Sequence, residues 1–172
     1  MIDSELPRPI KIKSIASEPY TVTASPDECS ALAKRFDLSS VEKVHAIVDL
    51  IRDGDIISAQ GTLDAEWTQS CALSGDDFPV LHQEPIELRF VPTRTDWQPD
   101  DEVELTAEDC DELEYEGDTF DLGEAIAQSL GLAIDPYATG PNANAARKSK
   151  NIQTEGQQDG PLAELLAGLK RG

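Results

Sequence analysis

Two consecutive stretches of the chain alternate apolar and polar residues, and a short turn sequence separates them. On one face the first stretch carries Val44, Ala46, Val48 and Leu50. The second carries Ile57, Ala59, Gly61, Leu63, Ala65 and Trp67. The intervening Arg52-Asp53-Gly54-Asp55 contains an Asp-Gly pair, which favours a tight hairpin turn. Because successive side chains of a strand point to opposite faces of a sheet, this pattern predicts two long antiparallel strands with one buried face.

Further strands are predicted on both sides of this hairpin. After a turn over 74–77, a third long strand is expected, with apolar residues at Phe78, Val80, Ile86, Leu88 and Phe90. Whether Pro85 interrupts it stays open, because proline cannot donate to a sheet ladder. Gly61 favours a bulge or bend in the second strand. An edge strand is expected over 10–15, and a short strand around Leu113 and Tyr115.

Capping signals mark two helices. Ser25-Pro26-Asp27-Glu28 combines an N-cap serine, a proline suited to the first turn and a capping-box glutamate, and predicts a helix over 26–36. Asp121 is the expected N-cap of a second helix, with Glu124 at the capping-box position and an apolar stripe from Leu122 to Leu130. These elements predict an α+β fold, in which an antiparallel meander of long strands carries two capped helices.

The composition changes after the second helix. Residues 136–160 are rich in Gly, Asn, Ala, Gln and Lys, which is typical of a flexible, disordered linker. In the last segment, 161–172, the leucines at 162, 165, 166 and 169 share one face of a short amphipathic helix. Since so short a helix is not stable alone in water, it is expected to dock on the core or on a partner. We therefore expect a single domain over 1–135, a linker and a Leu-rich C-terminal segment.

Negative charge is concentrated in one part of the chain. The formal net charge is −20, and residues 95–146 contain 15 acidic residues and no Lys, Arg or His. Because phosphate contacts dominate nucleic-acid affinity, such a chain is a poor nonspecific RNA binder. The basic residues are expected to bind RNA weakly at best; they form two small clusters, Arg8, Lys11 and Lys13, and Arg147, Lys148 and Lys150.

The acidic stretch suggests a docking surface for a basic partner, although acid-rich loops often do no more than face water. The candidate partner-binding residues are Asp100, Asp101, Glu102, Glu104, Glu108, Asp109, Asp111, Glu112 and Glu116. A metal-assisted hydrolase acting on RNA is the alternative, because clustered carboxylates such as Asp100-Asp101-Glu102 can bind divalent cations. These acids follow no EF-hand pattern, so no metal site is predicted.

Other kinds of chemistry find little support in the sequence. The cysteines at 29, 71 and 110 lack the spacing of a zinc knuckle, and they are expected to be reduced. The histidines at 45 and 82 fall on separate predicted strands, and no nucleophile elbow, P-loop or dinucleotide fingerprint is present. No catalytic residue and no cofactor are predicted. The absence of a long apolar run or an N-terminal signal favours a cytoplasmic location.

The segment Glu114-Tyr115-Glu116-Gly117-Asp118-Thr119-Phe120-Asp121-Leu122-Gly123 carries a family resemblance. It also has a structural reading, in which Gly117 turns the chain and Asp121 caps the next helix. The segment resembles the signature of the YceD family, the large ribosomal RNA subunit accumulation proteins. Supporting similarities are Gln69-Ser70-Cys71-Ala72-Leu73, Phe90-Val91-Pro92 and the Leu-rich C-terminal segment, so the resemblance extends over roughly 40–170. The residues that carry it most directly are Cys71, Glu114, Tyr115, Gly117, Asp118, Asp121, Leu122 and Gly123.

Many members of that family have Cys-x-x-Cys at the position of Cys71 and a second cysteine group after the last core helix. Here Ser74 takes the second position and 134–138 contains no cysteine, so the resemblance is to a cysteine-poor, alphaproteobacterial-type branch and brings no zinc site with it. It implies a bacterial, non-enzymatic factor in the synthesis, processing or accumulation of large-subunit ribosomal RNA. The implied partner is then a basic ribosomal protein or a pre-large-subunit particle, with no membrane.

Overall fold

The structure is a computed structural model that describes residues 4–93 and 112–150. The chain divides into two compact units. The first comprises 1–69 and 79–135, and the second comprises 70–78 and 136–172. No helix among the described residues has the length and apolar character needed to cross a membrane.

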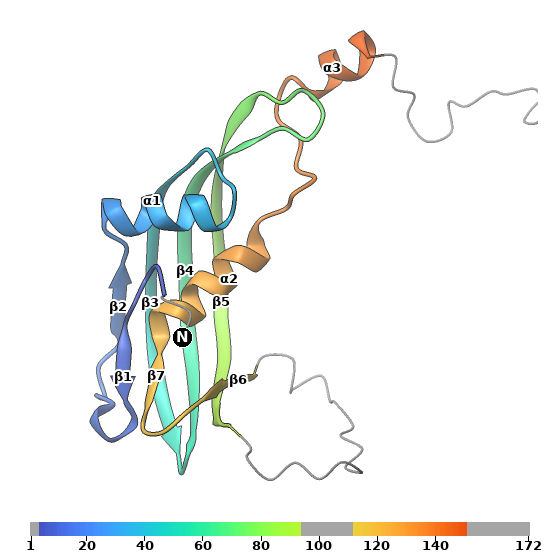
Figure 1. Ribbon diagram of the computed structural model, residues 1–172. Helices are drawn as coiled ribbons and strands as arrows, with labels where there is room; N and C mark the ends of the chain where they lie inside the picture. Colours follow the sequence, from blue (N-terminus) through green and yellow to red (C-terminus); the bar gives the residue numbers. More distant parts are fainter. Residues whose placement is uncertain (1–3, 94–111, 151–172) are drawn as a thin grey trace, which may run out of the picture. The chain divides into compact units, whose positions relative to one another are not determined.

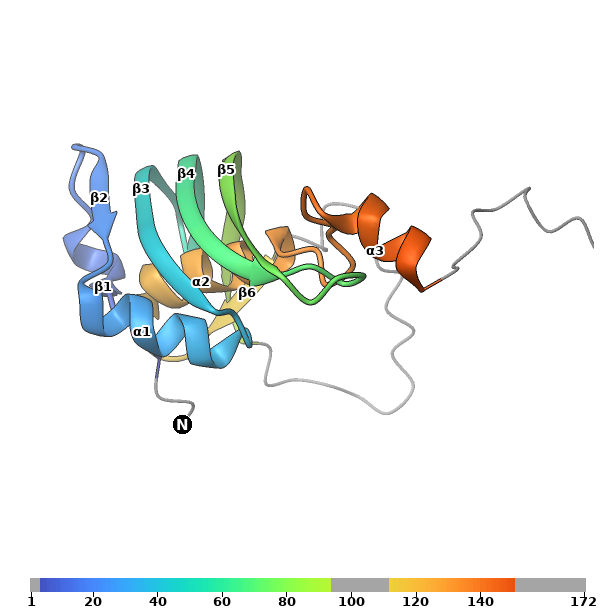
Figure 2. The ribbon, with the colours of Figure 1, turned by 90° about the horizontal axis from the view of Figure 1, so that it is seen from above.

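Five strands form the main sheet, in the order β2-β3-β4-β5-β6. Their bounds are Tyr20–Thr23, Ser40–Asp53, Ile56–Ser70, Asp77–Pro92 and Glu112–Tyr115. β3 pairs antiparallel with both β2 and β4, whereas β6 runs parallel to β5. The three long strands β3, β4 and β5 follow one another side by side (Figure 2). The predicted meander of long strands is therefore confirmed, and β5 continues through Pro85 without a break.

The register of β3 and β4 is set by the predicted hairpin, in which Asp53 faces Ile56 across the turn. The bulge expected at Gly61 is not found: Gly61 pairs regularly with Val48, and the irregularity in this ladder lies between Val41 and Lys43. Gly61 has a different role, since a Cβ there would lie 2.0 Å from the backbone oxygen of Ile47. The glycine therefore permits close approach of two strands.

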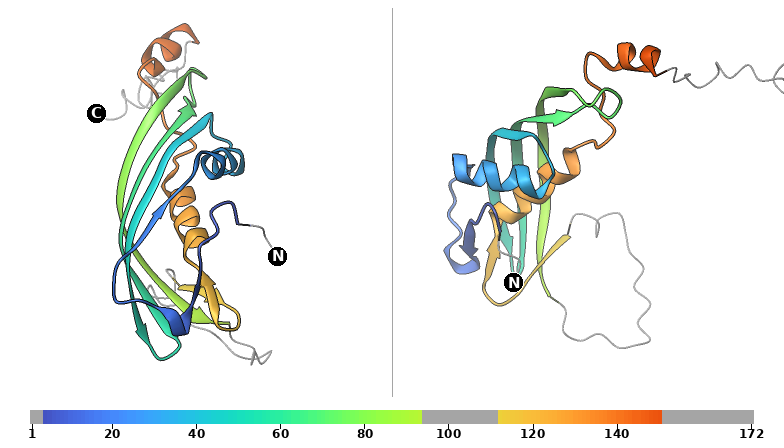
Figure 3. Two further views of the ribbon diagram at one scale, coloured as in Figure 1. Left: turned by 90° about the vertical axis from the view of Figure 1, so that its left-hand side faces the viewer. Right: turned by 45° about the horizontal axis from the view of Figure 1, so that its top comes forward.

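Two helices cover one face of the sheet (Figures 1 and 3). α1 spans Pro26–Arg35 and has the predicted capping box between Ser25 and Glu28. α2 spans Leu122–Ala133 and buries the predicted apolar stripe. Alternate strand residues on the covered face are buried with them, and the largest fully buried side chains are Trp67, Leu6, Leu32, Ile57, Leu63, Leu122, Ile126, Leu130, Val44 and Val48. The α+β prediction is confirmed.

A second, two-stranded sheet pairs β1, Pro9–Lys11, antiparallel with β7, Thr119–Asp121. The edge strand predicted over 10–15 is therefore too long, because a 3-10 turn, η1, takes over at Ile12–Ser14. β2 and β7 were not predicted from the sequence. Both are short, and strands this short carry too few alternating positions for a periodicity to be recognised.

The second unit contains a turn over 71–76 and the helix α3, Ala143–Ser149. The structure differs here from the expected linker over 136–160, because 143–149 is helical. The Lys150 ammonium donates to the Leu73 carbonyl oxygen at 2.9 Å, and the Ala72 N–H donates to that of Ala138 at 3.1 Å. The three alanines of α3 favour a helix here although the segment has no apolar stripe, because alanine has the highest intrinsic helix propensity. The expectation of a docked helix at 161–172 lies outside the described residues.

Candidate functional site

Residues 112–124, which we call the motif corner, run through β6, a turn, β7 and the first turn of α2. Tyr115 anchors the corner: its side chain is buried, its hydroxyl donates to the Asp55 carbonyl oxygen at 2.5 Å, and burial raises its pKa. The Phe120 ring lies with its centroid 6.5 Å from that of Tyr115 and 4.3 Å from that of Phe90. The aromatic residues of the motif thus join β6 and β7 to the core and to the tip of the β3–β4 hairpin.

Two glycines of the motif meet different structural demands. Gly117 has φ +73°, a conformation that other L-residues adopt only with strain, and the space around it is open. A Cβ at Gly123 would lie 1.7 Å from the Leu6 carbonyl oxygen. Gly117 therefore turns the chain, as predicted, whereas Gly123 lets the N-terminal segment pass directly against α2.

Asp121 is the N-cap of α2, as predicted. One of its carboxylate oxygens, Oδ1, accepts from the backbone N–H groups of Gly123 at 2.9 Å and Glu124 at 3.1 Å. It also accepts from the N–H of Arg8 at 2.8 Å. The same side chain therefore caps a helix and holds the N-terminal segment 113 residues away in the sequence.

Glu124 does not complete the expected capping box. Its carboxylate binds Arg35 instead, through Nη1–Oε2 at 2.9 Å and Nη2–Oε1 at 2.8 Å. Glu5 binds the same guanidinium at 2.7 Å. The Arg35 hydrogen bonds lower the pKa of Glu124 and raise that of Arg35. A paired arginine offers Glu124 a stronger, charge-assisted hydrogen bond than the Asp121 backbone N–H would.

The motif corner borders a pocket of about 220 Å³. Its lining residues are Phe90, Leu113, Glu114, Tyr115, Thr119, Phe120, Asp121, Glu124, Ala125 and Gln128. Asp121 and Glu124 are engaged in the contacts described above. Glu114 is exposed, and its side chain has no hydrogen bond or ion pair within the part of the chain that the structure describes. The pocket therefore combines aromatic walls, three carboxylates and no basic residue.

Most of the candidate partner-binding acids, those at 100–111, lie outside the described residues. Glu112 lies on β6 and forms an ion pair with Arg89, Nη1–Oε1 3.0 Å. Glu116 is exposed after β6. Glu114 was counted among the family-motif residues, and it shares a strand face with Glu112. The alternation of Glu112, Leu113, Glu114 and Tyr115 could have placed Glu114 among the docking residues from sequence.

The arginines that hold the site in place were not predicted from the sequence. Arg35 joins α1 to α2, and Arg8 binds Glu28 through Nη1–Oε1 at 2.7 Å. Arg8 Nη2 also donates to Glu28 Oε2 at 3.1 Å and to the Thr23 carbonyl oxygen at 3.0 Å. Arg8 was assigned to a weak RNA-binding cluster, but its charge is committed to this pair. The excess of acidic over basic residues could have indicated these ion pairs from sequence, because each arginine has several carboxylates as potential partners.

Cys71 lies in the second unit, in the turn over 71–76. The thiol is buried, and the N–H of Ser74 donates to its sulfur at 3.4 Å. The Ser74 hydroxyl and backbone, with further backbone N–H groups, lower the pKa of Cys71 to about 6. Among the residues described, no three side chains of His, Cys, Asp or Glu are grouped to hold a metal ion.

A scan against models of protein families matches residues 59–167 to the family described as large ribosomal RNA subunit accumulation protein YceD. This match covers more than half of the chain and includes most of β4, all of β5 and the motif corner. The chain therefore belongs to the YceD family, as the motif predicted. The family's name implies a role in the accumulation of large-subunit ribosomal RNA. Searches of curated proteins and of solved structures returned no match.

Proposed function

We propose that this protein supports the accumulation of large-subunit ribosomal RNA as a non-enzymatic assembly factor that binds a basic ribosomal protein. The observation that carries the proposal is the stretch 95–146, with 15 acids and no basic residue, in a chain of this family. Opposite charge would steer a basic partner to this surface and disfavour bare RNA.

The motif corner suggests how one basic side chain is held. Its pocket is bordered by the exposed carboxylate of Glu114 and by the rings of Phe90, Tyr115 and Phe120. An arginine or lysine head placed there would gain an ion pair and an aromatic contact. Glu116 adds negative charge beside Glu114, whereas Glu112 is paired with Arg89, and the acids at 100–111 precede them in the chain.

The remaining motif residues support this surface from within. Tyr115, Gly117, Asp121 and Gly123 are used in packing, turning and capping. We therefore assign partner binding at this corner to Glu114 and Glu116, whose side chains have no internal contact within the described residues, and the shape of the corner to the residues that do.

Direct RNA binding is the weaker candidate. Arg8 is bound to Glu28, and Lys150 donates to the carbonyl oxygen of Leu73. Of the two basic clusters, Lys11, Lys13, Arg147 and Lys148 then remain without an ion pair among the described residues. These four cations are too few for tight binding against a net charge of −20.

Co-purification tests the proposal. The full chain, tagged and expressed at its natural level, should recover pre-large-subunit particles at low salt, and salt should weaken the association. Replacing Glu114 and Glu116 by Gln should reduce recovery. Asp27→Asn with Glu18→Gln, which remove exposed charges elsewhere, should not. A protein that elutes free of ribosomal RNA and ribosomal proteins at low salt contradicts the proposal.

A further inference from the structure

One edge of the main sheet is only partly covered. β2 pairs with β3 from Tyr20 opposite Val48 to Thr23 opposite His45. β3 continues to Asp53, and no described strand pairs with it on that side beyond Val48. The chain before β2 contains Pro19, which has no N–H to extend the ladder, and it turns away from β3 there.

The backbone groups that face this open edge can be identified. The N–H of Ala24 donates to the Val44 carbonyl oxygen at 3.0 Å, so Val44 directs its backbone groups toward β2. In an antiparallel ladder this direction alternates with each residue. Ala46 and Val48 therefore also face β2, and Leu50 and Arg52 direct their N–H and C=O groups toward the uncovered side. Ile51 directs its own toward β4, where it lies opposite Ser58.

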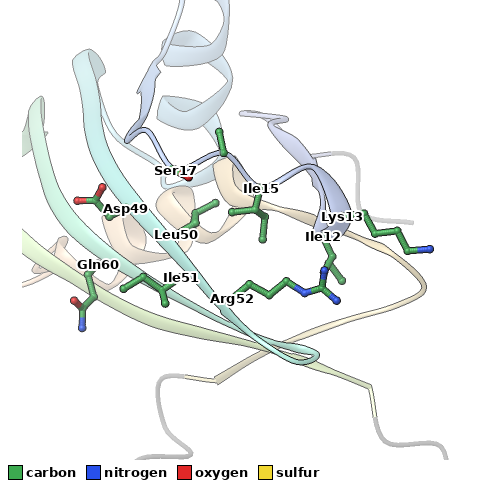
Figure 4. A pocket seen from close by; sticks show the side chains of 10 residues that line it. Ile12, Lys13, Ile15, Ser17, Asp49, Leu50, Ile51, Arg52 and Gln60 are labelled. Carbon is green, nitrogen blue, oxygen red and sulfur yellow. The ribbon is translucent and has the colours of Figure 1, made fainter.

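A pocket of about 630 Å³ lies at this edge (Figure 4). Its lining residues are Ile12, Lys13, Ile15, Ala16, Ser17, Asp49, Leu50, Ile51, Arg52 and Gln60. The N-terminal segment forms the wall opposite β3, and the N–H of Ala16 donates to the Tyr20 hydroxyl at 2.9 Å, which fixes this wall. The pocket is therefore a gap where a strand would continue β2.

The lining of the gap contains two cations, Lys13 and Arg52, and one carboxylate, Asp49. Arg8, Arg35, Lys43 and Arg89 are each bound to carboxylates. Within the described residues, Lys13 and Arg52 form no ion pair, although Nε of Arg52 donates to the Gly54 carbonyl oxygen at 2.7 Å. Figure 4 shows the Arg52 side chain extending toward Ile12, while Asp49 lies at the other end of the pocket beside Gln60. One end of the gap thus carries the Arg52 cation, and Ile15 and Leu50 contribute apolar side chains to its lining.

We propose that an extended segment of a partner protein adds to β3 as an antiparallel strand in this gap. The residue opposite Leu50 would be apolar, because its side chain would share a face with Leu50 and Ile15. Two positions earlier, the residue opposite Arg52 would be a glutamate or aspartate. Main-chain hydrogen bonds to Leu50 and Arg52 would supply affinity, and these two side-chain positions would supply selectivity. This inference does not depend on the acidic docking surface proposed above.

The probe is the peptide acetyl-Ser-Glu-Val-Val-Thr-amide, titrated into the full-length, nitrogen-15-labelled protein and followed by NMR. On binding, the Leu50 and Arg52 amide protons should shift and become protected from solvent exchange, whereas that of Ile51 is protected from the start. Methylating the backbone nitrogen of the second valine, which faces Leu50, should abolish binding. Methylating that of the first valine, which faces away, should leave it intact.

Two substitutions at one position separate charge from backbone hydrogen bonding. R52Q removes the cation and should weaken binding roughly threefold. R52P also removes the edge N–H, without breaking a β3–β4 bond, and should weaken it by about tenfold or more. K43Q, outside the pocket on the same strand, is the matched control and should change nothing.

The proposal would be overturned if the peptide did not bind, or if it bound equally well when lysine replaced its glutamate. It would also be overturned if the two methylated peptides bound equally, or if binding were lost only when the first valine was methylated. Sedimentation of the free protein provides one more test. A dimer that R52P converts to a monomer would place a second copy of the chain on this edge and would also overturn the proposal.

Discussion

Arg35 and Glu124 are joined by two parallel hydrogen bonds, at 2.8 and 2.9 Å, that tie the last turn of α1 to the first turn of α2. Both side chains are about three-quarters buried, with exposed fractions of 25% and 23%. A pair in this position fixes the two helices relative to each other on the sheet. Removing one partner leaves the other charge partly desolvated, which costs more than the pair itself contributes.

We therefore expect R35Q to lower the free energy of unfolding of the first unit by roughly 1–3 kcal/mol. Urea denaturation followed by circular dichroism measures this. The matched control is K43Q, which removes the exposed Lys43–Glu66 pair at 3.6 Å and should cost less than about 0.5 kcal/mol. Equal losses in the two variants would show that the Arg35 network does not hold the helices.

Glu28 makes stability depend on pH in the acid range. Its carboxylate binds Arg8 and the Ser25 N–H, and these contacts lower its pKa to about 2 from an ordinary value near 4.5. A carboxyl whose pKa is depressed by folding contributes stability above its unfolded pKa and loses it as the pH falls toward the folded value. The contribution should thus be complete at pH 6 and disappear between about pH 4.5 and 2.

E28Q should accordingly lower the free energy of unfolding at pH 6 by an amount on the order of 1–3 kcal/mol. As the pH falls, the free energies of unfolding of E28Q and of the natural protein should become more similar. Urea midpoints at several pH values measure this. D27N, which removes the neighbouring exposed carboxylate in the same helix turn, is the control. A difference between E28Q and the natural protein that stays constant from pH 6 to 3 would contradict the prediction.

Local sequence patterns predicted the individual strands and helices of this fold but not the contacts between distant residues. Period-two alternation predicted β3 and β4, and capping chemistry predicted α1, because in each case neighbouring residues carry the information. Contacts such as Arg35–Glu124 and Asp121 with Arg8 join residues about a hundred positions apart, and no local pattern encodes them. Such contacts also redirected Glu124 from the expected capping box to an ion pair.

The candidate site was predictable in its charge but not in its geometry. The acid-rich stretch is evident from composition, and the motif identified the family. The role of Glu114 depended on which motif carboxylates are used internally, and only the folded chain decides that. Likewise, the open edge of β3 exists because β2 is four residues long, and a strand of that length has no clear periodic signature.

Two glycines of the motif should respond differently to substitution. Gly123→Ala would place a Cβ 1.7 Å from the Leu6 carbonyl oxygen, so the N-terminal segment must move away from α2, and several kcal/mol of stability should be lost. Gly117→Ala meets open space and should cost about 1–2 kcal/mol for its positive φ alone. Thermal unfolding of the two variants measures the difference.

Asparagine separates the two causes, because it tolerates a positive φ but cannot relieve a collision with the backbone. Gly117→Asn should recover much of the stability lost by Gly117→Ala. Gly123→Asn should be no better than Gly123→Ala. If asparagine rescued position 123 as well, conformation rather than close approach would explain that glycine.

The Cys71 thiol should be ionised at neutral pH. Hydrogen bonds from the Ser74 hydroxyl and backbone lower its pKa to about 6, whereas burial raises the pKa of Cys29. Replacing Ser74 by Ala removes the hydroxyl and leaves the backbone N–H, so the pKa of Cys71 should rise toward the ordinary value for cysteine. Thiolate absorbance at 240 nm, titrated from pH 5 to 10, follows the change.

Subtracting the titration of Cys71→Ala from that of the natural protein isolates the signal of this thiol from those of the other two cysteines. Ser70→Ala, which removes a nearby hydroxyl that donates to Asp77, is the control and should leave the midpoint unchanged. A midpoint near 8.5 in the natural protein would show that the Ser74 contacts do not stabilise the thiolate. A low midpoint that Ser74→Ala leaves in place would assign the effect to the backbone N–H groups of the turn alone.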